Sequence, residues 1–274
     1  MKKLTMVLAL VMALLLCALP AWAEETDASI QYILDKGELI LGLDDTFPPM
    51  GFRDDNNEIV GYDIDLAKEV ASRLGVTLKT QPIEWDAKEL ELSSKSIDCI
   101  WNGLSITPAR QESMSMTKGY MNNKIVLVVK GDKGYAAKED LVGKKIAVQN
   151  GSFAQEVLEE YEEYKDFYAS VDVLGYDEYL TALMDLQQDG VDAVLIDLVV
   201  AEYRIAGLND DNLVLIDSLE DDIFGVGFRK EDAALRDKVN AILAEMAQDG
   251  ATAKISEKWF GKDISILEDV AAAE

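Results

Sequence analysis

The chain has 274 residues, enough for two modest domains, and it contains no histidine. The absence of histidine excludes Ser-His-Asp and Cys-His catalysis and imidazole metal sites, and we expect neither a metal nor a cofactor. The net charge of −26 repels nucleic acid and anionic lipid head groups, so neither is expected as a partner.

The N-terminus has the features of a secretory signal. Two lysines precede an apolar run over residues 4–19, and the segment ends in small residues at Ala23. We expect cleavage after Ala23 and export to the periplasm or the outer face of the cytoplasmic membrane, because the run is too short to span a bilayer. Lipid attachment at Cys17 is the alternative, but a lipoprotein signal has a small residue before its cysteine, and here that residue is Leu16.

Strands and helices alternate through the first half of the chain. Apolar periodicity and turn residues predict helices over 24–37, 61–75 and 87–94, and strands over 38–43, 76–82 and 97–101. Turn residues at 54–57 predict a hairpin within 51–60. Cys99 lies on the last of these strands and is expected to be a buried core thiol.

Residues 101–110 form the stretch on which the predicted site depends. Gly103, two hydroxyl residues and a Thr-Pro helix start follow the predicted strand. Arg110 lies three residues after the N-cap, and a guanidinium holds a planar carboxylate through two parallel hydrogen bonds. The stretch therefore predicts an anion-binding cradle, with free N–H groups in a loop after the strand. The alternative is a surface arginine that pairs with a nearby carboxylate such as Glu112.

The second half of the chain repeats this design. A strand over 141–148 leads to a helix that begins at Ser152, and a helix that ends at Gly190 leads to a strand over 191–197. Strands that alternate with helices are typical of parallel sheets, and the duplication predicts two of them, each with a crevice at its strand ends. We therefore expect an α/β protein with two lobes, each a mostly parallel sheet flanked by helices.

The chain must cross between the lobes twice. Candidate hinges lie at about 120–124 and 220–224. Lobe 1 would then comprise residues 24–120 plus 225–274, and lobe 2 would comprise 125–220. Two hinge crossings permit the lobes to close around a ligand.

Five motifs resemble those of the extracytoplasmic polar amino-acid-binding proteins of ABC importers. This family includes the glutamine-, arginine-, cystine- and lysine/arginine/ornithine-binding proteins. The motifs are GYDIDLA at 61–67, SIT at 105–107 with Arg110, LVGKKIAV at 141–148, VDAV at 191–194 and KWFG at 258–261. Each is weak alone, but their common order extends the resemblance over about residues 28–262. It implies the two-lobed, type II periplasmic-binding-protein fold.

The resemblance implies which residues bind the two charged groups of an amino acid. Arg110 would bind the α-carboxylate, helped by Ser105 and by backbone N–H groups near Gly103 and Ser152. Asp197 would bind the α-ammonium; its alternative role, as N-cap of the following helix, is compatible with this.

Other positions would contact the ligand side chain. Phe47 and Trp85 would sandwich it, unless they are ordinary core aromatics. Asp44 would reach its distal end, unless it is a solvated loop charge. Such a pocket would disfavour a dicarboxylic ligand.

Three further residues depart from what many relatives have. Gln149 and Phe153 stand where relatives place different side chains, and Asn102 adds an amide. Aromatic faces attract cations. The combination of carboxylates, amides and aromatic rings suits a polar uncharged or cationic amino acid.

The resemblance implies a non-catalytic protein. It would capture a free polar or cationic L-amino acid, close around it and deliver it to the transmembrane permease of an ABC importer, and we expect a monomer. The alternative is an exported cyclohexadienyl dehydratase, which acts on prephenate or arogenate and needs a positioned acid. Glu84 or Asp44 could supply that acid, but nothing distinguishes either from a binding residue. An ammonium-binding Asp197 also fits an amino acid better than prephenate.

Overall fold

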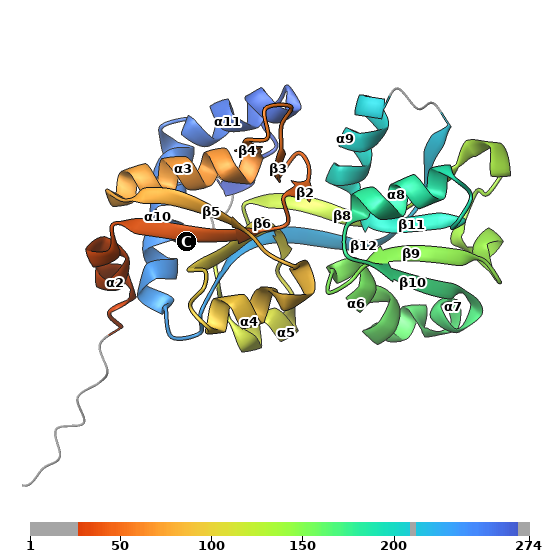
Figure 1. Ribbon diagram of the computed structural model, residues 1–274, viewed down its shortest axis with the longest axis horizontal. Coiled ribbons are helices and arrows are strands. Elements are labelled where there is room, and N and C mark those ends of the chain that lie inside the picture. Colours follow the sequence, from red (N-terminus) through yellow and green to blue (C-terminus); the bar gives the residue numbers. More distant parts are fainter. Residues whose placement is uncertain (1–26, 209–211, 268–274) are drawn as a thin grey trace, which may run out of the picture.

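The computed structural model describes residues 27–208 and 212–267, so the expected signal segment and Cys17 lie outside the described residues. Two lobes lie side by side and are connected by two long strands, β8 (Met121–Lys130) and β12 (Leu213–Phe228) (Figure 1). The expected two-lobed α/β architecture is thus present. Within the described ranges, no helix combines the length and the apolar character needed to cross a membrane.

The first lobe is built on three parallel strands. β1 (Glu38–Leu43) pairs on one side with β5 (Thr77–Pro82) and on the other with β6 (Cys99–Ser105). Figure 1 shows α3 and α11 on one side of this sheet and α4 and α5 on the other. The helices are α2 (Ser29–Lys36), α3 (Tyr62–Leu74), α4 (Lys88–Ser93), α5 (Pro108–Ser113), α10 (Ala233–Gln248) and α11 (Ala251–Phe260). Shorter elements are β2 (Thr46–Phe47), β3 (Gly51–Arg53), β4 (Ile59–Val60), β7 (Ser115–Met116) and the 3₁₀-helix η1 (Trp85–Ala87).

The second lobe has the same plan. β9 (Lys145–Gln149) lies between β10 (Asp172–Tyr176) and β11 (Ala193–Asp197), and all three are parallel. Its helices are α6 (Phe153–Glu160), α7 (Lys165–Ser170), α8 (Tyr179–Gln187) and α9 (Leu198–Leu208). Three 3₁₀-helices complete it: η2 (Gly131–Lys133), η3 (Lys138–Leu141) and η4 (Glu162–Tyr164).

The two crossing strands join the parallel sets of the lobes into one hydrogen-bonded sheet. β8 pairs antiparallel with β11, β12 pairs antiparallel with β6, and β8 and β12 pair antiparallel with each other. Apart from Tyr120, both segments predicted as hinges lie on these strands. Asn123 is the register partner of Asp222, and Lys124 is the register partner of Asp221.

Several predicted boundaries are wrong. β6 does not end at residue 101 but continues to Ser105, so Gly103 lies in a strand and not in a loop. The strand predicted over 141–148 begins only at Lys145. Gly143 has φ +75°, and the N–H of Lys144 donates to the carbonyl of Leu141 at 2.9 Å, which makes the preceding residues a turn. Apolar residues before a strand satisfied the sequence pattern although their backbone turns.

Two of the resembling motifs hold the first lobe together. Asp65, from GYDIDLA, accepts hydrogen bonds from Trp259 Nε1 at 2.8 Å and from Lys258, both from KWFG. Asp63, which is fully buried, accepts from the N–H of Gly103 at 2.8 Å and from the hydroxyl of Tyr120 at 2.9 Å. The motif therefore fixes the position of β6.

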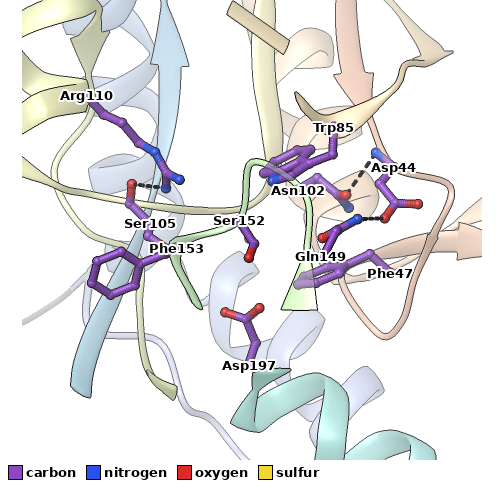
Figure 2. Close-up of a pocket in the computed structure, with 11 residues that line it drawn as sticks. Asp44, Phe47, Trp85, Asn102, Ser105, Arg110, Gln149, Ser152, Phe153 and Asp197 are labelled. Carbon is purple, nitrogen blue, oxygen red and sulfur yellow. Dashed lines mark hydrogen bonds between the residues drawn. The ribbon is translucent and has the colours of Figure 1, made fainter. Parts of the chain in front are cut away.

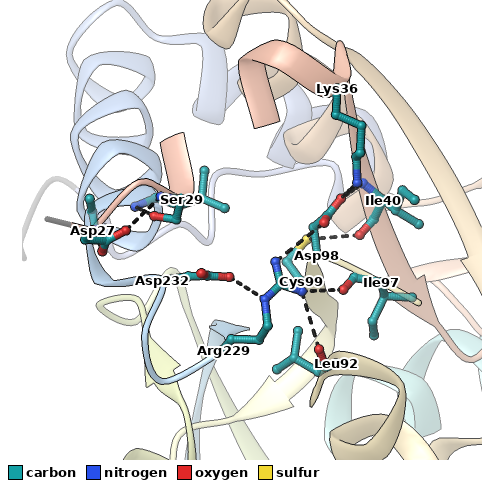
Figure 3. A network of polar contacts seen from close by, with 12 residues as sticks. Asp27, Ser29, Lys36, Ile40, Leu92, Ile97, Asp98, Cys99, Arg229 and Asp232 are labelled. Carbon is teal, nitrogen blue, oxygen red and sulfur yellow. Dashed lines mark hydrogen bonds and ion pairs between the residues drawn. The ribbon is translucent and has the colours of Figure 1, made fainter. Parts of the chain in front are cut away.

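A polar network lies at the end of the first lobe that is away from the second lobe (Figure 3). Fully buried Asp98 accepts hydrogen bonds from Lys36 and from the N–H of Ile40. Arg229, 4% exposed, donates to the carbonyl of Ile97 at 2.7 Å and pairs with Asp232 at 2.6 Å. These contacts join α2 and the start of β6 to the turn before α10. Since the charges are paired and lie away from the cavity between the lobes, the network is structural.

Cys99 lies beside this network and is fully buried, as predicted. Burial raises the pKa of its thiol, so the reactive thiolate is suppressed.

Candidate functional site

A small cavity lies between the lobes, and side chains from both line it (Figure 2). All ten residues predicted as the site surround this one cavity. The first lobe contributes Asp44, Phe47, Trp85, Gly103, Ser105 and Arg110, and the second contributes Gln149, Ser152, Phe153 and Asp197. Asn102, noted in the sequence as an additional amide, is the eleventh lining residue.

Arg110 is held by the local structure that the sequence predicts. Thr107 caps α5, and its hydroxyl accepts from the backbone N–H of Arg110 at 3.3 Å. The buried guanidinium donates from Nη1 to the carbonyl of Ser105 at 3.0 Å, and its Nη2 lies 3.8 Å from Glu156 of the other lobe. Burial lowers the pKa of Arg110. A guanidinium has five N–H groups, so donors remain for an anion in the cavity.

Backbone donors for the carboxylate were expected near Gly103 and Ser152, and the N–H groups of these two residues themselves are occupied. The N–H of Gly103 donates to Asp63, and the N–H of Ser152 donates to the carbonyl of Gln149 at 3.2 Å. Gly103 is nevertheless required, because its φ is +61° and a Cβ atom there would lie 2.8 Å from the Phe47 ring. Its role is to let Phe47 approach β6.

Asp197 ends β11, and its carboxylate faces the cavity (Figure 2). Asn123 donates to it from Nδ2 at 2.7 Å, and Asn123 Oδ1 accepts from the N–H of Val199 at 3.5 Å in the first turn of α9. Burial and the nearby carboxylate of Asp222 raise the pKa of Asp197 to about 8. A cationic group in the cavity would restore the ionised form.

Asp44 lies at the opposite end of the cavity from Arg110 in Figure 2. Its carboxylate accepts from the N–H and hydroxyl of Thr46 at 2.8 and 2.7 Å, and from Gln149 Nε2 at 2.7 Å. Its own N–H donates to Asn102 at 3.1 Å. Asp44 is buried, which excludes the solvated-loop alternative, and burial raises its pKa.

Acidic side chains surround this end, and Arg204 is a cation close enough to interact with Asp44. Burial raises the pKa of Glu178, and the negative charges of Asp44, Asp45 and Glu84 raise it further. This end therefore favours a cationic or neutral group over an anionic one.

Aromatic rings complete the cavity wall. Phe47, Trp85 and Phe153 are each less than 9% exposed. The Phe47 ring lies 6.0 Å from that of Tyr179, and the Phe153 ring lies 6.0 Å from that of Tyr161. These apolar walls exclude water from the charged groups.

Hydrogen bonds between the lobes hold the cavity closed. Besides Gln149 and Asp44, Lys88 of α4 donates to the carbonyl of Gly151 at 2.8 Å, and Arg204 of α9 donates to the carbonyl of Thr46 at 3.2 Å. Access to the cavity therefore requires these contacts to break.

Sequence reasoning missed Asn123 and Asp222. Both are buried, on β8 and β12, and Asn123 Nδ2 donates to Asp222 Oδ2 at 2.9 Å as well as to Asp197. They lie in segments interpreted only as hinges. No local pattern marks them, because Asn123 contacts residues 74 and 99 positions away in sequence, Asp197 and Asp222, and only the pairing of distant strands brings them together.

We expect the ligand-free protein to lose stability as the pH rises from about 4 to about 8. Burial raises the pKa of Asp197 to about 8 and that of Asp63 to about 7, whereas an aspartate carboxyl ordinarily has a pKa of 3.8. Between these values the folded state holds protons that the unfolded state has released, so the free energy of unfolding falls. Lys88, with a pKa lowered to about 8, opposes this trend only above that pH.

Thermal melts of ligand-free protein across this range test the expectation. The Asp197→Asn variant should show a shallower decline than the wild type. A wild-type melting temperature that rises with pH, or an unchanged slope in the variant, would contradict it.

Comparison with known proteins identifies relatives over most of the chain. The profile of the bacterial extracellular solute-binding proteins, family 3, matches residues 39–262. The L-cystine-binding protein TcyJ of Escherichia coli K12 is 33% identical over 235 residues, which cover 85% of this chain and 86% of the relative. An ABC transporter arginine-binding protein of the same strain is 31% identical, covering 80% of this chain and 89% of the relative.

Solved structures agree with this relationship. A substrate-binding protein of an ABC uptake transporter from Streptococcus pneumoniae, with bound histidine, superposes with a TM-score of 0.83 at 37% identity, covering 88% of this chain and 98% of that one. An ancestral amino acid-binding protein, AncCDT-1, a precursor of cyclohexadienyl dehydratase, gives 0.77 at 30% identity, covering 85% and 99%. The chain therefore belongs to family 3 of the bacterial extracellular solute-binding proteins.

Proposed function

We propose that this protein binds a free amino acid between its lobes and delivers it to an ABC importer. The observation that carries the proposal is the pair of opposite charges that face one cavity, Arg110 from the first lobe and Asp197 from the second. A zwitterion satisfies both at once: its carboxylate accepts from the guanidinium, and its ammonium donates to Asp197. Because the two groups belong to different lobes, the ligand stabilises the closed state.

The side chain of the ligand would extend toward Asp44. That end offers carboxylate oxygens, the amides of Asn102 and Gln149, and the faces of Phe47 and Trp85. We propose a polar uncharged or cationic side chain, since the acidic surroundings oppose a second carboxylate and aromatic faces attract cations. Relatives and structural neighbours named for cystine, arginine and histidine support this range.

An enzymatic function on the same scaffold is the second candidate, because one structural neighbour is a precursor of cyclohexadienyl dehydratase. Catalysis would require an acid aimed at the substrate's leaving group. Asp44 lines the cavity, but its carboxylate already accepts hydrogen bonds from Thr46 and Gln149, whereas Glu84 is not among the lining residues. This arrangement favours binding.

A thermal-shift screen tests the proposal. The exported protein would be freed of ligand by unfolding and refolding, then mixed with each of the twenty amino acids, ornithine, citrulline, cystine, prephenate and arogenate. A ligand at 100 times its Kd adds about 2.7 kcal/mol to the free energy of unfolding, and hence several degrees to the melting temperature. We expect this for a narrow set of polar or cationic amino acids. A shift with prephenate or arogenate alone would favour the enzyme.

The family is extracellular by description, which agrees with the expected export. We further propose that the protein acts as a monomer and that β8 and β12 serve as the hinge. Light scattering after size-exclusion chromatography tests the first point. Scattering profiles with and without ligand test the second.

A further inference from the structure

A chain of hydrogen bonds runs from one lobe to the other through the crossing strands. Ser105 Oγ, on β6, donates to Asp222 Oδ2 at 3.0 Å. The same oxygen accepts from Asn123 Nδ2 at 2.9 Å, and that amide also donates to Asp197 Oδ1 at 2.7 Å. Ser105 and Asp197 line the cavity, whereas Asn123 and Asp222 connect them and are not among the lining residues. All four are 6% exposed or less.

The hydrogen-bond directions along this chain determine what Ser105 can offer a ligand. A hydroxyl has one proton to donate and lone pairs with which to accept. Because the Ser105 hydroxyl donates its one hydrogen to Asp222, the lone pairs of its oxygen remain available to a group in the cavity. Ser105 is therefore arranged to accept from an ammonium and not, as the family resemblance implies, to donate to a carboxylate.

The charges around Ser105 also favour a ligand ammonium. Asp197 and Asp222 share the amide of Asn123, so two carboxylates lie at this end of the cavity. The guanidinium of Arg110 faces both, but it also faces Glu156 and is the group expected to bind the ligand carboxylate. Tyr179, whose side chain is also close to both carboxylates, carries no positive charge. A ligand ammonium would thus relieve the repulsion between the two carboxylates.

We propose that Asp222 determines specificity for the α-ammonium group of the ligand. Its carboxylate adds a second negative charge at that end and turns Ser105 into a hydrogen-bond acceptor. It acts through Ser105 and Asn123, and it is a positioning residue. This inference rests on the proposed amino-acid-binding function and assigns to that site a residue outside the lining set.

The Asp222→Asn variant tests the charge with little change of shape. The amide oxygen that replaces Oδ2 can still accept from Ser105 and Asn123, while the negative charge and the hydrogen bond from the N–H of Ile223 to Oδ1 are lost. Asp221→Asn is the matched control, because Asp221 is the adjacent residue, its side chain is 84% exposed, and it pairs with Lys124 at the surface. Both variants change the net charge equally.

Each protein would be titrated with the amino acid that ranks first in the screen and with its α-hydroxy-acid analogue. For L-arginine this is argininic acid, which keeps the side chain and carboxylate but has a hydroxyl in place of the ammonium. We expect Asp222→Asn to reduce the preference for the amino acid over the analogue about tenfold, the usual scale of a hydrogen bond to a charged group. Asp221→Asn should keep the wild-type preference. Ser105→Ala should also reduce it, because an acceptor for the ammonium is removed.

The outcomes separate the inference from the function on which it rests. If Asp222→Asn weakens both ligands by the same factor, or neither, Asp222 is only structural and the inference is wrong. If Ser105→Ala weakens the binding of the amino acid and of its analogue by the same factor, Ser105 serves the carboxylate, and the inference is wrong as well. If the wild type binds no amino acid, the proposed function fails first and the inference fails with it.

Discussion

Replacing Arg110 by methionine is expected to weaken amino-acid binding by about a hundredfold or more, the cost of truncating one partner of a buried charge pair. Arg110 is 6% exposed, and its guanidinium is the cation that lines the cavity among the described residues. Without it the ligand carboxylate would be buried with no charged partner and would lie near Glu156. Methionine keeps much of the volume of the side chain, so the cavity should remain closed to water. Isothermal titration calorimetry measures the loss.

Arg73→Met is the control for this variant. Arg73 pairs with Glu69 and Asp249 at 2.8 Å on the surface of the first lobe, away from the cavity. Its replacement should leave the Kd unchanged within about twofold, since surface ion pairs contribute little. An Arg110→Met protein that remains folded, by circular dichroism, and binds with the wild-type Kd would exclude Arg110 from the site.

Asp197→Asn is expected to weaken binding by about a hundredfold and, at pH 8, to stabilise the ligand-free protein. Binding weakens because the α-ammonium loses an ionised acceptor. The ligand-free protein gains stability because burial and the charge of Asp222 oppose ionisation of Asp197, and an amide carries no charge. The amide oxygen of the substituted side chain can still accept from Asn123. A lower affinity together with a higher melting temperature distinguishes a ligand-binding carboxylate from a structural one.

Asp189→Asn provides the contrast in the same lobe. Asp189 is exposed, and it pairs with Lys133 and Lys130, which lower its pKa to about 2. Its replacement should destabilise the protein slightly and leave binding unchanged. If Asp197→Asn lowers the melting temperature at pH 8 as Asp189→Asn does, the assignment of Asp197 as a strained binding group is wrong.

The fold was largely predictable because its signals are local. The α3 helix begins after Gly61 and ends before Gly75, as the apolar spacing and the glycines indicate, and Thr107 caps α5 as predicted. Strand ends were less predictable. β6 continues through Gly103 to Ser105 because it pairs with β12, and that pairing has no counterpart in the local sequence.

The cavity lining was predictable for a related reason. In parallel sheets the carboxyl ends of the strands meet, so side chains after β1, β6, β9 and β11 converge whatever the details of the loops. Hydrogen-bond partners were not predictable in this way. The occupied N–H of Gly103 depends on Asp63 of α3, and the contact of Ser105 with Asp222 depends on the register of β12 against β6.

The ladder between β8 and β12 has a consequence for observing the protein at work. Since residues 121–124 are paired in register with 221–224, the two crossings must bend together, and neither can slide without breaking backbone hydrogen bonds. A hinge at these two strands, as proposed above, would reduce the relative motion of the lobes to a rotation, which one distance describes. Cysteines introduced at the exposed positions Leu90 on α4 and Met184 on α8 would accept fluorophores, while buried Cys99 would not. A single donor–acceptor pair would then record opening and closing in real time, molecule by molecule.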